Sequence, residues 1–272
     1  MKYIVAVSGG VDSVVLLHMM FQINPKSIVV AHFDHGIRPD SAEDAEFVRQ
    51  LAKKYNLPFE LKREELGSQA SEAFARERRY EFLNNLARHY NARIVTAHHL
   101  DDIVETIALN FTRGTGWRGL ASMGSQVVRP LIDIEKSRLI SYAKANGIEW
   151  REDSTNQTDK YLRNRIRHKS SKLPTDTKRQ LRALHATQHQ LRKQIDEEAR
   201  KLIGDGPEYS RYQFINMGDA AAINCLWVVF SGQLTRPQLK KVLHMVKTAK
   251  PGAVLQAGSG QNVHFTSRKF IV

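Results

Sequence analysis

The sequence contains one cysteine, Cys225, among 272 residues. A single cysteine cannot form a disulfide within the chain, and its apolar neighbours favour a buried thiol over a nucleophile. No group of cysteines and histidines has the spacing of a zinc site. No apolar run is long enough to cross a bilayer, and the first residues enter a strand rather than a signal peptide. We therefore expect a cytoplasmic protein with no membrane partner.

Acidic residues are also scarce. The chain has 28 Asp and Glu against 41 Lys and Arg, a net charge of +13. Thirteen of the basic residues and only four acidic ones lie between Lys160 and Lys201, so this segment alone carries a net +9. A merely soluble basic surface would spread its charge more evenly. The concentration predicts a polyanionic partner such as nucleic acid.

The stretch Tyr3–Ser13 combines a short apolar run, a glycine turn and the start of an apolar helix. Glycines without a Cβ let phosphate oxygens approach the backbone, and the first turn of a helix offers unpaired N–H groups and a positive dipole end. The motif is not a Walker A loop, because the chain contains no Gly-Lys-Ser/Thr. An ordinary glycine turn is the alternative. The predicted phosphate-binding residues are Ser8, Gly9, Gly10, Val11, Asp12 and Ser13. Asp12 would repel a bare phosphate, so we expect it to act through Mg²⁺ or a substrate donor.

Strands and helices alternate through the first half of the chain. After the first strand, further strands are predicted at 27–33, 59–62 and 93–97, with a possible edge strand at 126–128. Helices are predicted near 41–55, 71–90, 102–113 and 135–146. This alternation predicts a doubly wound parallel α/β sheet, in which ligands bind beyond the carboxyl ends of the strands. The segments 8–13, 34–38 and 98–102 all follow strands at that edge.

The pattern changes after Trp150. Helices are predicted at 178–203, 219–230 and 236–247, and a hairpin at 253–256 and 263–272. We expect two domains: a catalytic domain of residues 1–168, and a smaller, mainly helical domain of residues 169–272 that ends in the hairpin.

The densest group of titratable residues follows the fourth strand: His98, His99, Asp101, Asp102 and Glu105. On a helix, spacings of three and four place the carboxylates on one face. Because like charges repel, a cation is expected among them, either Mg²⁺ or the ammonium group of a substrate. The alternative is a helix start with ordinary acidic capping. Either histidine could be a base or a core residue bonded to the backbone.

Arginines near two loops are candidates for binding phosphate. Arg113 opens the glycine-rich segment RGTGWRG, which follows a helix rather than a strand and therefore does not fit a dinucleotide-binding motif. Arg163, Asn164 and Arg167 lie in the segment that joins the two halves. Arginine suits bidentate recognition of phosphate.

Six segments together carry a resemblance to a known family. In chain order they are SGGVDS, DHGIR, EAFARERRYEFL, TAHHLDDIVET, RGTGWRGLASM and EDSTNQTDKYLRNRIRH. The first resembles the pyrophosphatase loop of enzymes that split ATP into AMP and pyrophosphate. Jointly, over residues 1 to about 168, the segments resemble the tRNA(Ile)-lysidine synthetase family. Longer members of that family have an additional C-terminal domain, of which we expect little or none here.

The resemblance implies an adenine nucleotide alpha hydrolase-like fold and a role for each motif. The expected reaction ligates lysine to C2 of the wobble cytidine of tRNA(Ile), using ATP and Mg²⁺ and releasing AMP and pyrophosphate. The expected partners are tRNA(Ile), L-lysine and a second copy of the chain in a homodimer. By this resemblance the catalytic residues are Asp12, Asp102, Glu105 and Arg113; Asp102 and Glu105 bind lysine; Asp12 and Asp34 organise Mg²⁺; and Arg163, Asn164 and Arg167 contact tRNA or phosphate.

Two other classes of function are open. One is a different ligase with the same loop, such as a tRNA thiolase or an amide-forming synthetase. A single cysteine speaks against thiolation, and an amide-forming synthetase leaves the basic segment unexplained. The other is a binding protein with an inactive nucleotide loop. The acidic residues at positions 12, 102 and 105 argue against it.

Overall fold

The structure is a computed structural model that describes residues 1–37, 41–67, 70–113, 115–120, 127–152 and 162–272, without the side chains of 162–164. Its contacts divide the chain into two compact units, Met1–Ala186 and Thr187–Val272. The expected boundary after His168 lies inside the first unit. Helix α7 (Leu162–Ser171) belongs to that unit because it packs on α4 (Leu100–Thr112).

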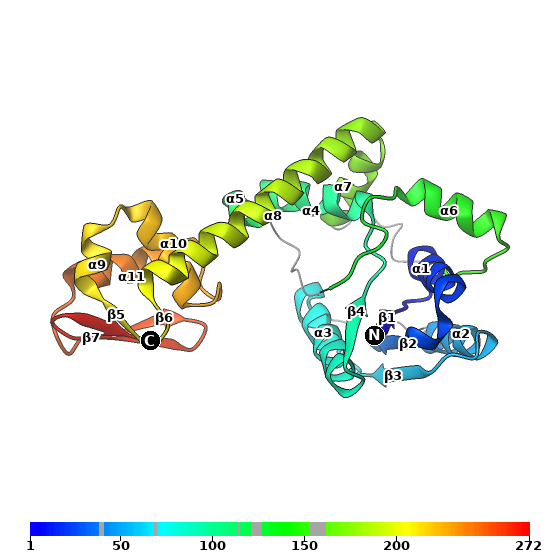
Figure 1. The fold of residues 1–272 in the computed structure, drawn as a ribbon, viewed down its shortest axis with the longest axis horizontal. Helices are drawn as coiled ribbons and strands as arrows, with labels where there is room; N and C mark the ends of the chain where they lie inside the picture. The colour runs from blue at the N-terminus through cyan, green and yellow to red at the C-terminus, as the bar shows by residue number, and fades with distance from the viewer. Residues whose placement is uncertain (38–40, 68–69, 114, 121–126, 153–161) are drawn as a thin grey trace. The chain divides into compact units, whose positions relative to one another are not determined.

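The first unit is built on a four-stranded parallel sheet (Figure 1). Its strands are β1 (Lys2–Ala6), β2 (Ile28–Asp34), β3 (Phe59–Arg63) and β4 (Ala92–Val95), in the order β3-β2-β1-β4. Val128 adds one parallel bridge to Val95, and the amide of Thr96 donates to its carbonyl at 3.0 Å. The expected edge strand is thus a single bridge, and Gln126 lies outside the described residues.

Helices cover both faces of this sheet. Besides α4 and α7 they are α1 (Val11–Ile23), α2 (Ser41–Lys54), α3 (Glu72–His89), α5 (Gly116–Leu120) and α6 (Lys136–Ala145), with a 3₁₀ turn at Pro25–Ser27. Successive residues of β1 point to opposite faces: Val5 packs with Leu17 and Leu139 in one core, whereas Ile4 packs with Phe82 in the other. The predicted doubly wound α/β fold is confirmed.

The spacing of apolar residues in the helices expected at 71–90 and 102–113 predicts that Phe74 and Phe111 are buried, but both are exposed. Phe74 is 46% and Phe111 79% exposed. Phe74 lies in the first turn of α3, before the buried positions Ala75, Phe82 and Leu83. Phe111 lies in the last turn of α4, beyond Leu109, the last buried residue of that helix. Both predicted helices form, but the row of apolar side chains on each one extends beyond the part of the helix that packs against the core.

Helix α8 (Thr175–Ile203) begins in the first unit and continues into the second. The second unit adds α9 (Arg211–Asn216), α10 (Asp219–Val229) and α11 (Arg236–Thr248). It also contains four strands: β5 (Glu208–Ser210), β6 (Val254–Gly258), β7 (Gln261–Phe265) and β8 (Lys269–Ile271). They form an antiparallel sheet in the order β5-β8-β7-β6. The predicted hairpin is therefore part of a four-stranded sheet, whose three-residue strand β5 is too short to show a pattern.

Cys225 is buried, as predicted. None of the described helices combines the length and apolar character that crossing a membrane requires.

Candidate active site

The loop between β1 and α1 has the geometry of a phosphate-binding turn. Gly9 adopts a φ of +93°, and Gly10 is the N-cap of α1 without a side chain to cover its first turn. The Ser13 hydroxyl donates to the Gly10 carbonyl at 2.9 Å and accepts from the Ser8 amide at 3.1 Å. These bonds close the turn from inside. The N–H groups of the first helical turn have no helical partners, so they are available to an anion.

A second loop at the same edge of the sheet begins α4. His99 is the N-cap, and its amide donates to Oδ2 of Asp102 at 2.8 Å. The His99 ring is 3% exposed. Its Nε2 atom lies 3.6 Å from Oδ2 of Asp12 and 3.6 Å from Oδ2 of Asp102, and its Nδ1 atom lies 3.7 Å from Oδ2 of Asp101. His99 thus links the phosphate-binding loop to the carboxylates of α4.

Three cationic side chains of the chain itself lie among these carboxylates, whereas the expected Mg²⁺ or substrate ammonium stays a prediction. Lys136 Nζ lies 2.9 Å from Asp12 Oδ2, and Lys178 Nζ lies 2.7 Å from Asp101 Oδ1. Glu105, 2% exposed, accepts two bonds from Arg167, at 2.8 Å from Nε and 3.3 Å from Nη2. Each cation comes from a segment that follows the sheet, so the start of α6, α7 and α8 all converge on the site.

The field of these groups shifts several pKa values. Burial raises the pKa of Asp12, but His99 and Lys136 outweigh it, so the pKa is lowered below its ordinary value. Burial lowers the pKa of His99, but Asp12 and Asp102 outweigh it and raise the pKa above 6.5. Asp12 is therefore ionised and His99 is the more readily protonated histidine.

His98 behaves differently. Burial, assisted by Arg129, Arg76 and Arg79, lowers its pKa to about 4 against the pull of Asp102. Its Nδ1 atom bonds the Thr96 hydroxyl at 2.7 Å. His98 is thus a neutral ring near pH 7 that bonds a side-chain hydroxyl rather than the backbone, and both of its expected roles stay predictions.

The two expected metal ligands differ in how well they fit a magnesium ion. Oδ1 of Asp12 is buried and makes no hydrogen bond in the described part of the chain, so this oxygen fits a cation. In Asp34, Oδ1 accepts from the Gly36 amide at 2.9 Å and Oδ2 lies 3.6 Å from Arg63. Among the described residues no group of three or more His, Cys, Asp and Glu is arranged around a common point. Magnesium usually takes one or two carboxylates together with phosphate oxygens and waters, so the single carboxylate of Asp12 is compatible with such a site. The role of Asp34 stays a prediction.

The expected arginines are placed unequally. Arg113 is the exposed C-cap of α4, and the adjoining Gly114 lies outside the described residues. Arg167 reaches Glu105, and the negative charges of Glu105, Asp102 and Asp12 raise its pKa although burial lowers it. The backbone of Arg163 and Asn164 belongs to α7, but their side chains lie outside the description. The phosphate-binding roles of these residues stay predictions.

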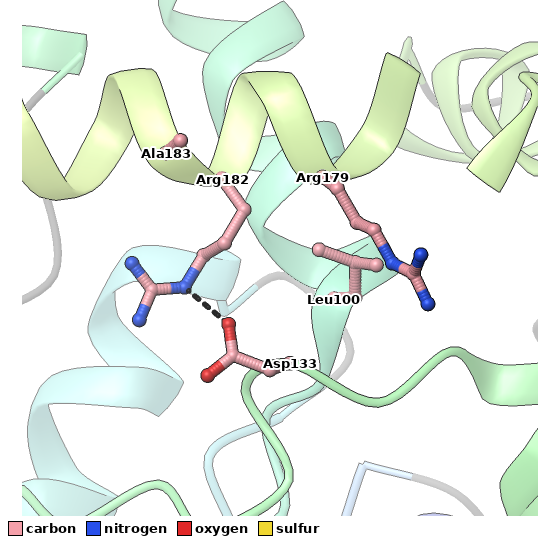
Figure 2. A pocket seen from close by; sticks show the side chains of 5 residues that line it. All are labelled: Leu100, Asp133, Arg179, Arg182 and Ala183. Carbon is pink, nitrogen blue, oxygen red and sulfur yellow. Dashed lines mark ion pairs between the residues drawn. The ribbon is translucent and has the colours of Figure 1, made fainter. Parts of the chain in front are cut away.

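A hollow of about 400 Å³ adjoins the second loop from the side of α8. It is lined by Leu100, Asp133, Arg179, Arg182 and Ala183. Figure 2 shows Arg182 reaching down from α8 to Asp133, with Nε 3.1 Å from Oδ1. Leu100 lies between His99 and Asp101 in sequence, so the hollow borders the site. The two arginines give its rim a positive charge.

Sequence reasoning missed Lys136, Lys178 and Arg151. Lys136 is 124 residues from Asp12 and Lys178 is 77 residues from Asp101, so no local spacing connects them. Arg151 pairs with Glu43 and Asp44, and its amide donates to the Gly9 carbonyl at 2.9 Å. The only available signal was the excess of acidic residues in the cluster, which required some cation.

Comparison with known proteins agrees with this geometry. The profile of a family described as the PP-loop domain matches residues 1–174. The chain belongs to the PP-loop family. A PP-loop domain uses ATP, which agrees with the phosphate-binding geometry of the turn after β1.

Curated relatives of this PP-loop protein carry one name. A tRNA(Ile)-lysidine synthase of Solibacter usitatus is 41% identical over 170 residues, covering 60% of this chain and 39% of the relative. The Thermus thermophilus protein of the same name is 44% identical over 172 residues, covering 60% of this chain and 34% of the relative. The chain spans well under half of the length of these relatives. Among solved structures, the U34-tRNA thiolase NcsA of Methanococcus maripaludis has a TM-score of 0.59 at 14% identity, covering 70% of this chain and 71% of that one. This likeness concerns the fold alone.

Proposed function

We propose that the protein is an ATP-dependent ligase that joins L-lysine to C2 of the wobble cytidine, position 34, of a tRNA(Ile) with a CAU anticodon. The observation that carries the proposal is that the ATP-binding loop lies directly against a carboxylate cluster, with His99 within 3.7 Å of Asp12, Asp101 and Asp102. Ligation of lysine needs a nucleotide site and an ammonium site side by side. The name shared by the curated relatives supports the same reaction.

The chemistry explains why ATP is required. The C2 carbonyl of cytosine is a weak, urea-like electrophile, and its oxygen is a poor leaving group. Transfer of the adenylyl group to this oxygen releases pyrophosphate. The ε-amine of lysine then attacks C2, loses a proton to a nearby carboxylate, and AMP leaves with the former carbonyl oxygen. The amides of the turn after β1 would hold the departing pyrophosphate.

The residues of the site divide between the two substrates. Asp12 would hold Mg²⁺ through Oδ1, which accepts no hydrogen bond from the described residues, and the ion would neutralise charge on the phosphates. Asp102 and Glu105 would bind the lysine ammonium, which at Glu105 means sharing or replacing Arg167. Arg113 would stabilise charge on the α-phosphate.

The tRNA would contact the basic segment that contains α7 and α8. Its reacting base must leave the stack, which is easier in an anticodon loop than in a duplex. Arg163, Asn164 and Arg167 are proposed to position the RNA, and binding should weaken steeply with salt. A tRNA substrate supports the expected cytoplasmic location, which stays a prediction. Homodimer formation stays a prediction.

The test is incubation of the full chain with ATP, labelled lysine and a tRNA(Ile) transcript with the CAU anticodon. Label should enter this tRNA, with one AMP formed per lysine, and should not enter a transcript that differs only by uridine at position 34. Label from sulfide or from another amino acid would instead support a different PP-loop ligase. The single, buried Cys225 argues against thiolation.

A further inference from the structure

Lys178 is a basic residue that is buried and therefore cannot contact a polyanion. It lies in the first turn of α8 but is only 4% exposed, whereas the side chain of its neighbour Arg179 is 65% exposed. Its Nζ atom lies 2.7 Å from Asp101 Oδ1 and 3.4 Å from the Ser171 carbonyl, and Glu135 is 3.7 Å away. A buried ammonium surrounded in this way binds neither RNA nor a substrate phosphate. Its function must act through the residues that it holds.

Asp101 is the residue held most closely, and its second oxygen serves another purpose. Oδ2 accepts the backbone N–H of Lys136 at 2.9 Å and lies 3.7 Å from His99 Nδ1. Asp101 thereby hydrogen-bonds the start of α6 and lies within ion-pair distance of the imidazole ring, whose buried Nδ1 makes no hydrogen bond in the described part of the chain. Without a cation on Oδ1, this buried carboxylate would turn toward other donors.

Both contacts of Asp101 lead to the same atom of the ATP-binding loop. The Lys136 ammonium lies 2.9 Å, and His99 Nε2 3.6 Å, from Asp12 Oδ2. The Asp101 carboxylate thus contacts two partners of Asp12, through the backbone N–H of Lys136 and beside the ring of His99. This leaves the other oxygen of Asp12, the buried Oδ1, without a hydrogen bond in the described part of the chain.

We propose that Lys178 is a positioning residue for the ATP-binding loop: by holding Asp101, it keeps Lys136 and His99 in place against Asp12. The inference rests on the proposed role of Asp12 in nucleotide binding, but not on lysine or tRNA as substrates. It deepens the proposed function by adding a residue, remote in sequence, on which the nucleotide site depends.

The test compares two lysines in the full chain. Lys178→Met keeps the volume and removes the charge. Lys247→Met is the matched control, because Lys247 is also 2.7 Å from a carboxylate, that of Asp219, but on the surface. Titration with a non-hydrolysable ATP analogue should give about tenfold weaker binding for Lys178→Met, as expected when a site group is slightly misplaced, and at most about a twofold change for the control. In turnover, the KM for ATP should rise and the KM for lysine should stay within about twofold.

A purely structural role is separated by chemical rescue. Lys178→Ala removes three carbons and a nitrogen, which propylammonium replaces and the neutral 1-propanol matches in size. We expect propylammonium to restore nucleotide affinity and 1-propanol to leave it low. Equal rescue by both, or unchanged affinity in Lys178→Met, would overturn the inference.

A folding defect is controlled by a double variant. Asp101→Asn with Lys178→Met removes both buried charges and should melt closer to the wild-type temperature than Lys178→Met alone. Its nucleotide affinity should remain low, and wild-type affinity would count against the proposal. Wild-type protein that binds the analogue but transfers no lysine would refute the proposed function while leaving this test intact.

Discussion

The Lys136 ammonium lies 2.9 Å from Oδ2 of Asp12, although 124 residues separate the two in sequence. Asp12 is the single acidic residue of the turn after β1, and its charge would otherwise oppose the approach of the triphosphate that we propose binds there. Lys136 is the first residue of α6, which follows the last strand of the parallel sheet. A residue from this later part of the chain therefore supplies a cation to the first loop. The contact keeps Asp12 ionised and partly neutralised.

Removing this cation should make the reaction more sensitive to acid. Because Lys136 helps lower the pKa of Asp12 against the effect of burial, Lys136→Met should raise that pKa. The rate of AMP formation should then fall at a higher pH than in the wild type, with about a tenfold loss at the acidic end. A pH profile of AMP release checks this, and Asp12→Ala should abolish release throughout. An unchanged acidic limb in Lys136→Met would contradict the assignment.

Gly9 is required for its backbone conformation. At a φ of +93°, an added Cβ would lie 3.5 Å from Phe47 and 3.6 Å from Val48, which are ordinary contacts. Gly9→Ala should therefore lower the unfolding free energy by about 1–2 kcal/mol through strain rather than collision. Gly147→Ala, at a φ of +59° with open space around it, should cost a similar amount but leave ATP affinity intact. Equal nucleotide affinity in both variants would show that the turn does not bind ATP.

The pair of Glu105 and Arg167 should be important for stability. Arg167→Gln removes the guanidinium that makes two hydrogen bonds to Glu105, which is only 2% exposed. The unfolding free energy should fall by about 3 kcal/mol, because a buried charge loses its partner. Adding Glu105→Gln should recover part of the loss, since both charges are then gone. Lys201→Gln, which breaks an exposed pair with Glu198, should leave the unfolding free energy nearly unchanged, because solvent screens an exposed ion pair. Urea titrations of the four proteins would measure this.

Asp102 can be tested without disturbing the helix start. Asp102→Asn keeps an oxygen that accepts the His99 amide, so the cap of α4 should remain. Loss of the charge should raise the KM for lysine about tenfold and leave the KM for ATP nearly unchanged. If both constants stayed at wild-type values, Asp102 would have no role in lysine binding.

Stability should depend on pH at both ends. Burial raises the pKa of Asp101, but Lys136 and Lys178 outweigh it, so the pKa is below its ordinary 3.8. The contribution of Asp101 to the unfolding free energy is therefore present above a pH of about 4 and is lost as the pH falls through the lowered pKa. His99 has a raised pKa, so its contribution is present below about 6.5 and is lost as the pH rises through the raised value. Asp101→Asn should flatten the acidic side of a stability profile, and His99→Gln the alkaline side.

The sequence was most informative where pattern and chemistry coincide. The alternation of strands and helices predicts the doubly wound sheet, and Ser8–Ser13 predicts the turn that the structure places after β1. The cluster from His98 to Glu105 does gather at the same edge, because parallel strands end together.

What could not be predicted depends on tertiary contacts. Nothing near Lys178 distinguishes it from the exposed basic residues of α8, since its burial arises from packing against a loop 77 residues earlier. Arg167 carried the signal of a phosphate ligand, yet it reaches Glu105 in this structure. Phe111 follows the apolar stripe of α4 but extends beyond the surface that the stripe covers.

Helix α8 has a practical consequence for anyone dividing this chain. The border between the compact units falls between Ala186 and Thr187, inside one continuous helix from Thr175 to Ile203. A cut there would strip four carbonyls on one side and four amides on the other of their helical bonds. Fragments designed around the two units should fray at the severed ends. A split before Thr175 would separate Lys178 from Asp101, so it should be placed after Ile203, where a natural helix terminus already exists.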